Sequence, residues 1–364
     1  MTNEAIDMSR GVPPTDLLPT EKVKECAMSA MDNFGRSLLQ YHSKITPTVQ
    51  GFQPLMELLA DEMGNGAKQE NVLIGNGSLD VFDILTNSLV EAGDNVLVES
   101  PSYDRSITTL ERAGCNVTGV PLEEDGLDTG RLADLVEEKN FKLLYIIPDF
   151  QNPSGITTST KKRNEVTELA EEHDFWIIED SPYYKLRYKG EHKPRMWDLS
   201  PQKVLYMSSF SKLIAPGLRI GWTIIPEDIN EKVLQYAEDS YITPSILSQG
   251  VVYEFLQRGW LEPNIEKLKE SYVVRLNALL ENLESKMPEA SWAEPEGGFF
   301  VGLNLPGGTT FTDLEEKSEE LGLNFSDSRK FFPEGGDVNF LRIPFCTLSP
   351  EEIEESISRL KEVL

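Results

Sequence analysis

The sequence predicts an α/β protein with a large domain, built on a mostly parallel sheet flanked by helices, and a smaller α+β domain. Between residues 71 and 225, short continuous apolar runs alternate with amphipathic segments at helical spacing. This alternation is typical of parallel strands that helices cover on both faces. After Trp260 the alternation stops, and a long charged helix precedes a short mixed region. A chain of 364 residues is long enough for two domains of this kind.

The elements of the large domain follow from the pattern in chain order. A helical segment at residues 53–63 ends in a Gly-Asn-Gly turn, which is a common way for a helix to stop. Helices are also expected between some of the strands, at residues 78–90 and 160–173. The expected strands are the apolar runs at residues 71–74, 95–98, 142–147, 175–178, 203–207 and 219–225.

The small domain is expected to combine both ends of the chain. Its elements are a helical run at residues 20–39, a charged helix at residues 261–285, an apolar segment at residues 299–301, a strand at residues 339–343 and a helix at residues 351–364. We therefore assign residues 46–260 to the large domain, and residues 1–45 together with residues 261–364 to the small domain.

The composition excludes several classes of partner. A formal net charge of −27 argues against a nucleic-acid partner, because phosphate binding calls for a basic surface. The three cysteines lie far apart and the three histidines are scattered, so we expect neither a disulfide framework nor a metal site. No apolar run approaches the length of a membrane span, and the first residues carry no signal-like apolar core. We expect a cytoplasmic protein.

Residues 208–222 place a lysine, hydroxyl residues and an arginine between two apolar strands. A lysine just after a buried strand is partly shielded from water, so the pKa of the Lys212 amine should fall and the amine become nucleophilic. Ser209, Ser211 and Arg219 are suited to hold a phosphate. A nucleophilic amine beside a phosphate site is what an enzyme requires to hold pyridoxal phosphate as a Schiff base. The alternative is a surface lysine in a serine-rich turn.

Further polar residues follow other predicted strands, where open parallel sheets bind ligands. The Gly-Asn-Gly-Ser-Leu run opens a helix at Gly77 and Ser78, whose free N–H groups suit a phosphate, unless the run is only a turn. Tyr103 follows the next strand and is either a stacking ring or an ordinary half-buried tyrosine. Asn152 lies in an Asn-Pro-Ser-Gly turn. Either its side-chain amide points toward the ligand-binding edge of the sheet, or the residue only stabilises the turn.

Two charged residues lie in or directly after apolar strands, where an unpaired charge is costly. Asp180 requires a cationic partner, for which a protonated pyridine nitrogen or a structural arginine or lysine would serve. Arg342 lies inside the apolar run at residues 339–343, and its planar guanidinium matches a carboxylate. A structural ion pair is the alternative for each of them.

Together these motifs resemble those of fold-type I pyridoxal-phosphate-dependent aminotransferases of class I and II, and most closely the group that includes 2-aminoadipate and kynurenine aminotransferases. The resemblance runs from about Gly11 to Phe345, nearly the whole chain. Its specific part is a set of residues in the order that the family has, namely Asn152, Asp180, Tyr183, Lys212, Arg219 and Arg342.

The resemblance implies a role for each residue that faces the cofactor ring. Lys212 forms the Schiff base with pyridoxal 5'-phosphate and later moves the proton of the substrate. Asp180, rather than Glu179, pairs with the pyridine nitrogen. Tyr183 donates to the phenolic oxygen of the cofactor, and Tyr103 lies flat against its ring.

The remaining roles concern the phosphate and the substrate. The resemblance places Gly77, Ser78, Ser209, Ser211 and Arg219 at the phosphate, and Leu79, where relatives often carry a polar residue, contributes only its backbone N–H. It also implies that Asn152 hydrogen-bonds the phenolic oxygen and, together with Arg342, holds the substrate carboxylate, with Gly11 at the substrate entrance.

Besides Leu79, three positions depart from the family pattern. Pro344 follows Arg342 by two residues where many relatives have asparagine. Tyr41 is the candidate for a tyrosine that reaches the phosphate of a partner subunit, but Gly51 comes later than usual, so the loop is longer or another residue does this. Arg10 stands where a small residue is usual, and it either binds a second carboxylate or lies on the surface.

The function that the resemblance implies is amino-group transfer from an amino acid to a 2-oxo acid, with 2-oxoglutarate as the expected acceptor, by a ping-pong mechanism in a homodimer with active sites at the interface. The alternative is elimination on the same scaffold, as in a carbon–sulfur or other β/γ-lyase. We do not expect a transcription regulator with an aminotransferase-like module, because the chain begins in the catalytic part and is strongly acidic.

Overall fold

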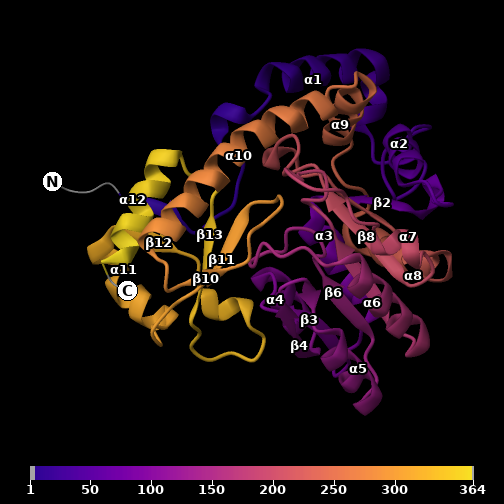
Figure 1. Ribbon diagram of the computed structural model, residues 1–364. Helices are drawn as coiled ribbons and strands as arrows, with labels where there is room; N and C mark the ends of the chain where they lie inside the picture. The colour runs from indigo at the N-terminus through magenta and orange to yellow at the C-terminus, as the bar shows by residue number, and fades with distance from the viewer. Residues whose placement is uncertain (1–4, 363–364) are drawn as a thin grey trace.

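The computed structural model describes residues 5–362 and contains an eight-stranded sheet, ordered β2-β9-β8-β7-β6-β3-β4-β5 (Figure 1). The strands β3, β4, β6, β7 and β8 pair in parallel, whereas β9 is antiparallel to both of its neighbours and β5 to β4. The sheet is therefore mostly parallel, as predicted. Its strands are β2 (Val72–Gly75), β3 (Asn95–Ser100), β4 (Asn116–Glu123), β5 (Gly126–Leu127), β6 (Leu143–Ile146), β7 (Trp176–Asp180), β8 (Val204–Ser209) and β9 (Gly221–Ile224).

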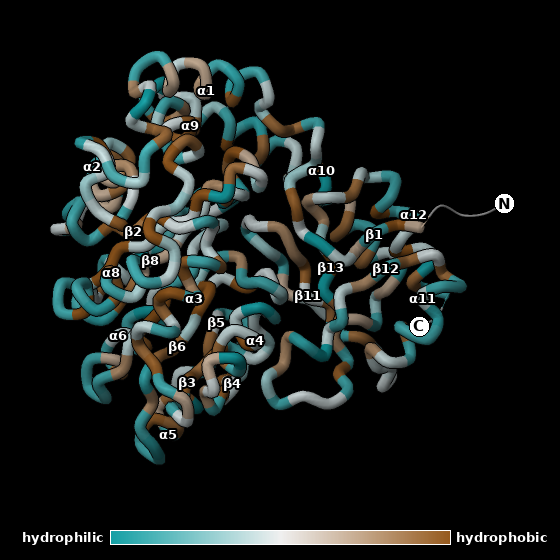
Figure 2. Tube along the Cα trace, turned by 180° about the vertical axis from the view of Figure 1, so that it is seen from behind, coloured by the Kyte–Doolittle hydropathy of each residue, from teal (hydrophilic) through white to brown (hydrophobic). Residues whose placement is uncertain are grey.

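Helices cover both faces of this sheet. Every residue of β2, β6, β8 and β9 is buried, and because side chains alternate between the two faces of a strand, both faces must be covered. Figure 2 shows the hydrophobic segments along these strands and hydrophilic segments on the outer helices. The helices of this part are α2 (Gln53–Met63), α3 (Ser78–Leu89), α4 (Asp104–Arg112), α5 (Thr129–Glu138), α6 (Thr160–Glu172), α7 (Met196–Leu199), α8 (Glu227–Tyr241) and α9 (Ile246–Gln257).

A second group of elements lies beside the large sheet, along α10 (Leu261–Lys286) (Figure 1). Its antiparallel sheet has the order β10-β11-β13. Near the N-terminus, β1 pairs in parallel with β12, while α1 packs on α9. The elements are β1 (Ile6–Met8), α1 (Thr20–Phe34), β10 (Ser291–Trp292), β11 (Phe300–Asn304), α11 (Phe311–Leu321), β12 (Leu323–Phe325), β13 (Phe340–Pro344) and α12 (Pro350–Lys361).

Several predicted boundaries were wrong, among them the following three. The helix predicted at residues 20–39 ends at Phe34, because Gly35 has a φ of 49° and a 3-10 turn follows. The strand predicted at residues 219–225 begins only at Gly221, since Arg219 adopts a left-handed conformation with φ 54°. The helix predicted at residues 351–364 runs over Pro350–Lys361, and residues 363–364 lie outside the described part of the chain.

Candidate active site

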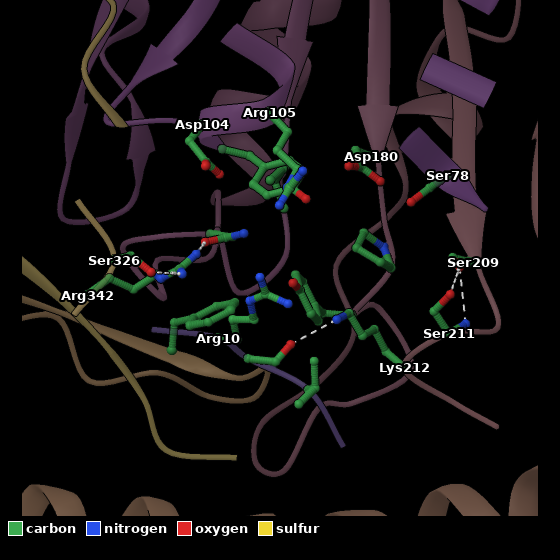
Figure 3. A pocket seen from close by; sticks show the side chains of 18 of the residues that line it. Arg10, Ser78, Asp104, Arg105, Asp180, Ser209, Ser211, Lys212, Ser326 and Arg342 are labelled. Carbon is green, nitrogen blue, oxygen red and sulfur yellow. Dashed lines mark hydrogen bonds between the residues drawn. The ribbon is translucent and has the colours of Figure 1, made fainter. Parts of the chain in front are cut away.

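A cavity of about 460 Å³ opens at the carboxyl ends of the parallel strands, between the large sheet and the second group of elements (Figure 3). Such strand ends are where open α/β sheets bind ligands. Residues far apart in the sequence meet there, including most of the predicted site. The predicted residues that line the cavity are Gly11, Ser78, Tyr103, Asn152, Asp180, Tyr183, Ser209, Ser211, Lys212 and Arg342.

The amine of Lys212 lies in this cavity, in the loop that follows β8. Its Nζ donates a hydrogen bond to the carbonyl oxygen of Gly11 at 2.9 Å and lies 5.4 Å from the ring centre of Phe299. Burial lowers the pKa of the amine from its ordinary value, and the positive charges of Arg342 and Arg219 lower it further. The neutral, nucleophilic form of the amine is thereby favoured.

A buried carboxylate, Asp180, ends strand β7 at the cavity. The hydroxyl of Tyr145 on β6 donates to its Oδ2 at 2.6 Å, whereas its buried Oδ1 has no hydrogen-bond partner in the described part of the chain. Burial raises the pKa of this carboxyl to about 7, against the Tyr145 hydrogen bond and the Lys212 charge. A buried polar atom without a partner is rare in folded proteins, so Oδ1 is available for a donor in the cavity.

The neighbouring carboxylate of Glu179 serves the fold. Successive strand residues point to opposite faces, and Glu179 accepts the backbone N–H groups of Met196 and Trp197 at 3.1 and 2.9 Å. These two residues begin α7, so the carboxylate caps that helix and does not line the cavity. Of the two adjacent acids, Asp180 is the one that the structure directs to the cavity.

Hydroxyl groups gather at the other end of the cavity, near the start of α3 (Figure 3). Ser209 Oγ accepts the N–H of Ser211 at 3.1 Å, and the two hydroxyls lie 3.0 Å apart. Ser78 is the first residue of α3, where backbone N–H groups are free and the helix dipole favours an anion. This end of the cavity therefore suits a phosphate.

Arg219 borders this end without lining the cavity itself. Its Nη2 donates to the carbonyl oxygen of Asn76 at 3.0 Å. Gly77 has a φ of 94°, and a Cβ there would lie 2.3 Å from the same Nη2. Glycine at position 77 thus lets the guanidinium reach the start of α3.

A buried arginine lies at the opposite end, on β13. Arg342 donates to Asn152 Oδ1 at 2.9 Å, to the carbonyl oxygen of Ser9 at 2.7 Å and to Ser326 Oγ at 2.6 Å. Each of these acceptors is neutral. Within residues 5–362, Arg342 Nε has no hydrogen-bond partner, and no carboxylate forms an ion pair with the guanidinium. A buried guanidinium without a counter-charge is costly, which makes an anionic ligand the expected partner.

Aromatic rings form the walls between these two ends. The buried ring of Tyr183 contacts Phe299 and Phe300, with ring centres 5.3 and 6.1 Å apart. Tyr103 precedes α4, and burial raises the pKa of its phenol to about 12. Both phenols therefore remain protonated and able to donate, since burial also raises the pKa of Tyr183 well above its ordinary value.

Not every predicted residue reaches the cavity, and several that do were not predicted. Gly77 and Leu79 do not line it, and Tyr41 is 69% exposed outside it. Tyr145, which contacts Asp180 without lining the cavity, was missed because it reads as part of the apolar run of β6. The unpredicted residues that line the cavity with charged or hydroxyl side chains are Ser9, Asp104, Arg105, Ser326, Asp327 and Lys330.

In residues 5–362, no helix is both long and apolar enough to cross a membrane. The same part of the chain holds no cluster of three or more histidine, cysteine, aspartate or glutamate residues arranged to bind a metal ion.

Comparisons with known proteins identify the family. The sequence model of the family "Aminotransferase class I and II" matches residues 3–360. An aromatic-amino-acid aminotransferase of Thermococcus litoralis is 32% identical over 100% of this chain and 88% of its own length. The 2-aminoadipate transaminase of Thermus thermophilus is 30% identical over 99% of this chain and 90% of its own. The crystal structure of a Pyrococcus horikoshii kynurenine aminotransferase superposes with a TM-score of 0.94 at 30% identity, covering 100% of this chain and 91% of that chain.

These matches confirm the family that the motifs resemble, and with it the fold, the cofactor and the type of reaction. The chain belongs to the class I and II aminotransferases, pyridoxal 5'-phosphate-dependent enzymes of fold type I that transfer amino groups.

Proposed function

We propose that the cavity at the carboxyl ends of the strands is where this transfer takes place, with Asp180 holding the pyridine nitrogen of pyridoxal phosphate. The observation that carries the proposal is the free, buried Oδ1 of Asp180, in a cavity that also contains an amine of lowered pKa. A protonated pyridine nitrogen supplies both the donor and the charge that this oxygen lacks. The residues present therefore fit the cofactor.

The phosphate of the cofactor is assigned to the hydroxyl end of the cavity. Ser78, Ser209 and Ser211 offer hydroxyl groups, and the start of α3 offers free N–H groups at its positive pole. Arg219 adds a guanidinium that, within residues 5–362, donates hydrogen bonds only to carbonyl oxygens. Gly77 and Leu79 contribute backbone alone.

The substrate carboxylate is assigned to Arg342 and Asn152. The amide oxygen of Asn152 holds one guanidinium nitrogen, which fixes the plane of the fork. The segment that contains Gly11 closes the cavity beside Lys212, because the carbonyl oxygen of Gly11 accepts a hydrogen bond from the Lys212 amine. An amino acid bound through its carboxylate at Arg342 would thus point its amino group toward Lys212.

Bound pyridoxal phosphate supplies an electron sink that makes the Cα proton of an amino acid acidic. Lys212 Nζ, whose neutral form is favoured because burial lowers its pKa, would accept this proton from Cα. The cationic pyridine nitrogen would keep Asp180 ionised, and the Tyr145 hydroxyl holds its carboxylate in position. Tyr183 and Asn152 would donate hydrogen bonds to the phenolic oxygen of the cofactor, and Tyr103 would lie against one face of its ring.

The acceptor is proposed to be 2-oxoglutarate, in a ping-pong cycle. The alternative, elimination by a β/γ-lyase, uses the same cavity, and product analysis separates the two. The cofactor-loaded protein is incubated with a panel of amino acids, first without and then with 2-oxo acids. Transfer predicts one equivalent of 2-oxo acid per site without an acceptor and continued turnover with 2-oxoglutarate. Ammonia and pyruvate formed without any acceptor would instead identify a lyase.

We further propose a cytoplasmic homodimer with active sites near the interface. Large apolar side chains are exposed on α1, in and just after the following 3-10 turn, at the end of α8 and on α9, and α1 packs on α9. Tyr41, proposed to reach the partner's phosphate, belongs to this surface. The apolar surface residues are Met28, Met31, Leu39, Tyr41, Ile242 and Leu247.

Light scattering coupled to gel filtration tests this state. It is expected to give twice the 41.0 kDa chain mass, and Leu39→Asp is expected to shift the mass toward one chain. A single-chain mass for the wild type would contradict the proposal.

The division into a large domain (46–260) and a small domain (1–45 with 261–364) also remains a proposal, which limited proteolysis can test.

A further inference from the structure

The cavity concentrates positive charge in an acidic protein. The chain has 34 lysines and arginines against 61 acidic residues, yet most charged side chains that line the cavity are cationic. The cations are Arg10, Arg105, Lys212, Lys330 and Arg342, and the acids are Asp104, Asp180 and Asp327. Such a cavity attracts anions, because the field of clustered charges is focused between its walls. The proposed functions of Lys212 and Arg342 leave three of these cations unexplained.

Arg10 differs from the other two in how its backbone is held. The carbonyl oxygen of Ser9, just before it, accepts a hydrogen bond from Arg342 Nη2 at 2.7 Å. The carbonyl oxygen of Gly11, just after it, accepts Lys212 Nζ at 2.9 Å. Its own carbonyl oxygen accepts the hydroxyl of Thr347 at 2.9 Å. Residue 10 is therefore fixed between the proposed amine and the proposed carboxylate site.

Among the described residues, the side chain of Arg10 has no competing hydrogen-bond or ion-pair partner. Figure 3 shows it between Arg342 and Lys212, with its guanidinium directed into the cavity. Within residues 5–362, no carboxylate forms an ion pair with it. Lys330, in contrast, lies 3.8 Å from Asp327, and Arg105 enters from α4 on the other side of the cavity.

We propose that Arg10 is a specificity-determining residue that binds a second carboxylate, so that the cavity favours dicarboxylic amino acids and 2-oxo acids. The inference rests on the proposed function, which places the first carboxylate at Arg342. The planar guanidinium of Arg10 offers a bidentate fork to the carboxylate at the far end of the substrate. This side chain is exposed at the opening of the cavity. When a substrate without a second carboxylate binds, the Arg10 guanidinium therefore stays in water, and no unpaired charge is buried.

The direct test measures binding of two unreactive acids with the same number of carbons to the cofactor-loaded enzyme. Glutarate has two carboxylates and valerate has one, and calorimetry gives both dissociation constants without turnover. The wild type is expected to bind glutarate more tightly. Arg10→Met is expected to weaken glutarate by about tenfold to a hundredfold and valerate by less than about threefold. Arg10→Lys should recover part of the loss, because it keeps the charge without the fork.

Two control variants separate a contact from a general charge effect. Arg131→Gln removes an exposed arginine of α5, outside the cavity, and should change neither constant. Arg105→Gln removes a cation that lines the same cavity. A glutarate loss in Arg105→Gln equal to that in Arg10→Met would overturn the assignment, because the effect would then come from the summed charge of the cavity.

Steady-state kinetics distinguish this inference from the proposed function. In Arg10→Met, kcat/KM for glutamate is expected to fall by the same factor as the glutarate affinity, while that for alanine changes little. Equal changes for both donors, or equal binding of glutarate and valerate by the wild type, would overturn the inference and leave amino-group transfer intact. No transfer by the wild type with any donor and acceptor would instead contradict the proposed function.

Discussion

Arg342 offers the sharpest perturbation of substrate binding. Arg342→Gln removes a buried guanidinium whose hydrogen bonds within residues 5–362 all go to neutral oxygens. Truncating one partner of a buried, hydrogen-bonded charge pair costs about 2–5 kcal/mol. At about 1.4 kcal/mol for each factor of ten, kcat/KM for every amino donor is expected to fall between about 30-fold and a few thousand-fold. Arg342→Lys should lose less, because it keeps the charge but not the fork.

The assay compares steady-state kinetics with thermal unfolding, so that loss of fold is recognised. Arg275 provides the matched control: its Nε donates to the carbonyl oxygen of Leu348 at 2.9 Å, outside the cavity. Arg275→Gln should lower stability and leave KM nearly unchanged. If Arg342→Gln changed kcat/KM no more than Arg275→Gln at equal stability, the assignment of the substrate carboxylate to Arg342 would be refuted.

Two further predictions concern a buried acid and a glycine. Burial raises the pKa of Glu99 to about 8, above its ordinary value of 4.5, so the stability that its protonated form provides is lost as the pH rises through about 8. Glu99→Gln, which cannot ionise, should therefore gain about 2 kcal/mol on the wild type between pH 6 and pH 9 in denaturant unfolding, and parallel pH profiles would contradict this. At Gly77, alanine would push a Cβ into the Arg219 guanidinium at a positive φ, so Gly77→Ala should weaken pyridoxal phosphate binding roughly tenfold in a cofactor titration. Gly217→Ala, where a Cβ meets no atom within 4 Å, is the control, and equal affinities in the two variants would disprove the steric argument.

The central strands were predictable because their residues are buried on both faces and therefore read as continuous apolar runs. β4 was not predicted, since its residues are half-exposed and Pro121 interrupts the apolar pattern. β5 has only two residues, too few to give a pattern. A strand at the edge of a sheet, such as β5, or next to it, such as β4, does not require the continuous apolar sequence of a strand at the buried centre.

The same distinction applies to the site. Polar residues directly after apolar strands, such as Asp180 and Lys212, stand out in the sequence because burying them is costly. Tyr145 does not, since a tyrosine is common in a buried strand. Only the register, which pairs Tyr145 with Ile178 on the adjacent strand, brings its hydroxyl to Asp180 two residues further along the same face. Ser326 reaches Arg342 through the fold of the second group of elements, which no local pattern encodes.

The identity of the lysine that carries the cofactor tests the account most directly. The protein is loaded with pyridoxal phosphate, reduced with borohydride, digested and analysed by mass spectrometry. Because Lys212 lies in the cavity with a lowered pKa, the mass of the reduced cofactor is expected on the peptide that contains it. In Lys212→Ala that label, and the pH-dependent absorbance of the bound cofactor, should disappear. A label on another cavity lysine, such as Lys330, or an unchanged absorbance response in Lys212→Ala, would contradict the account.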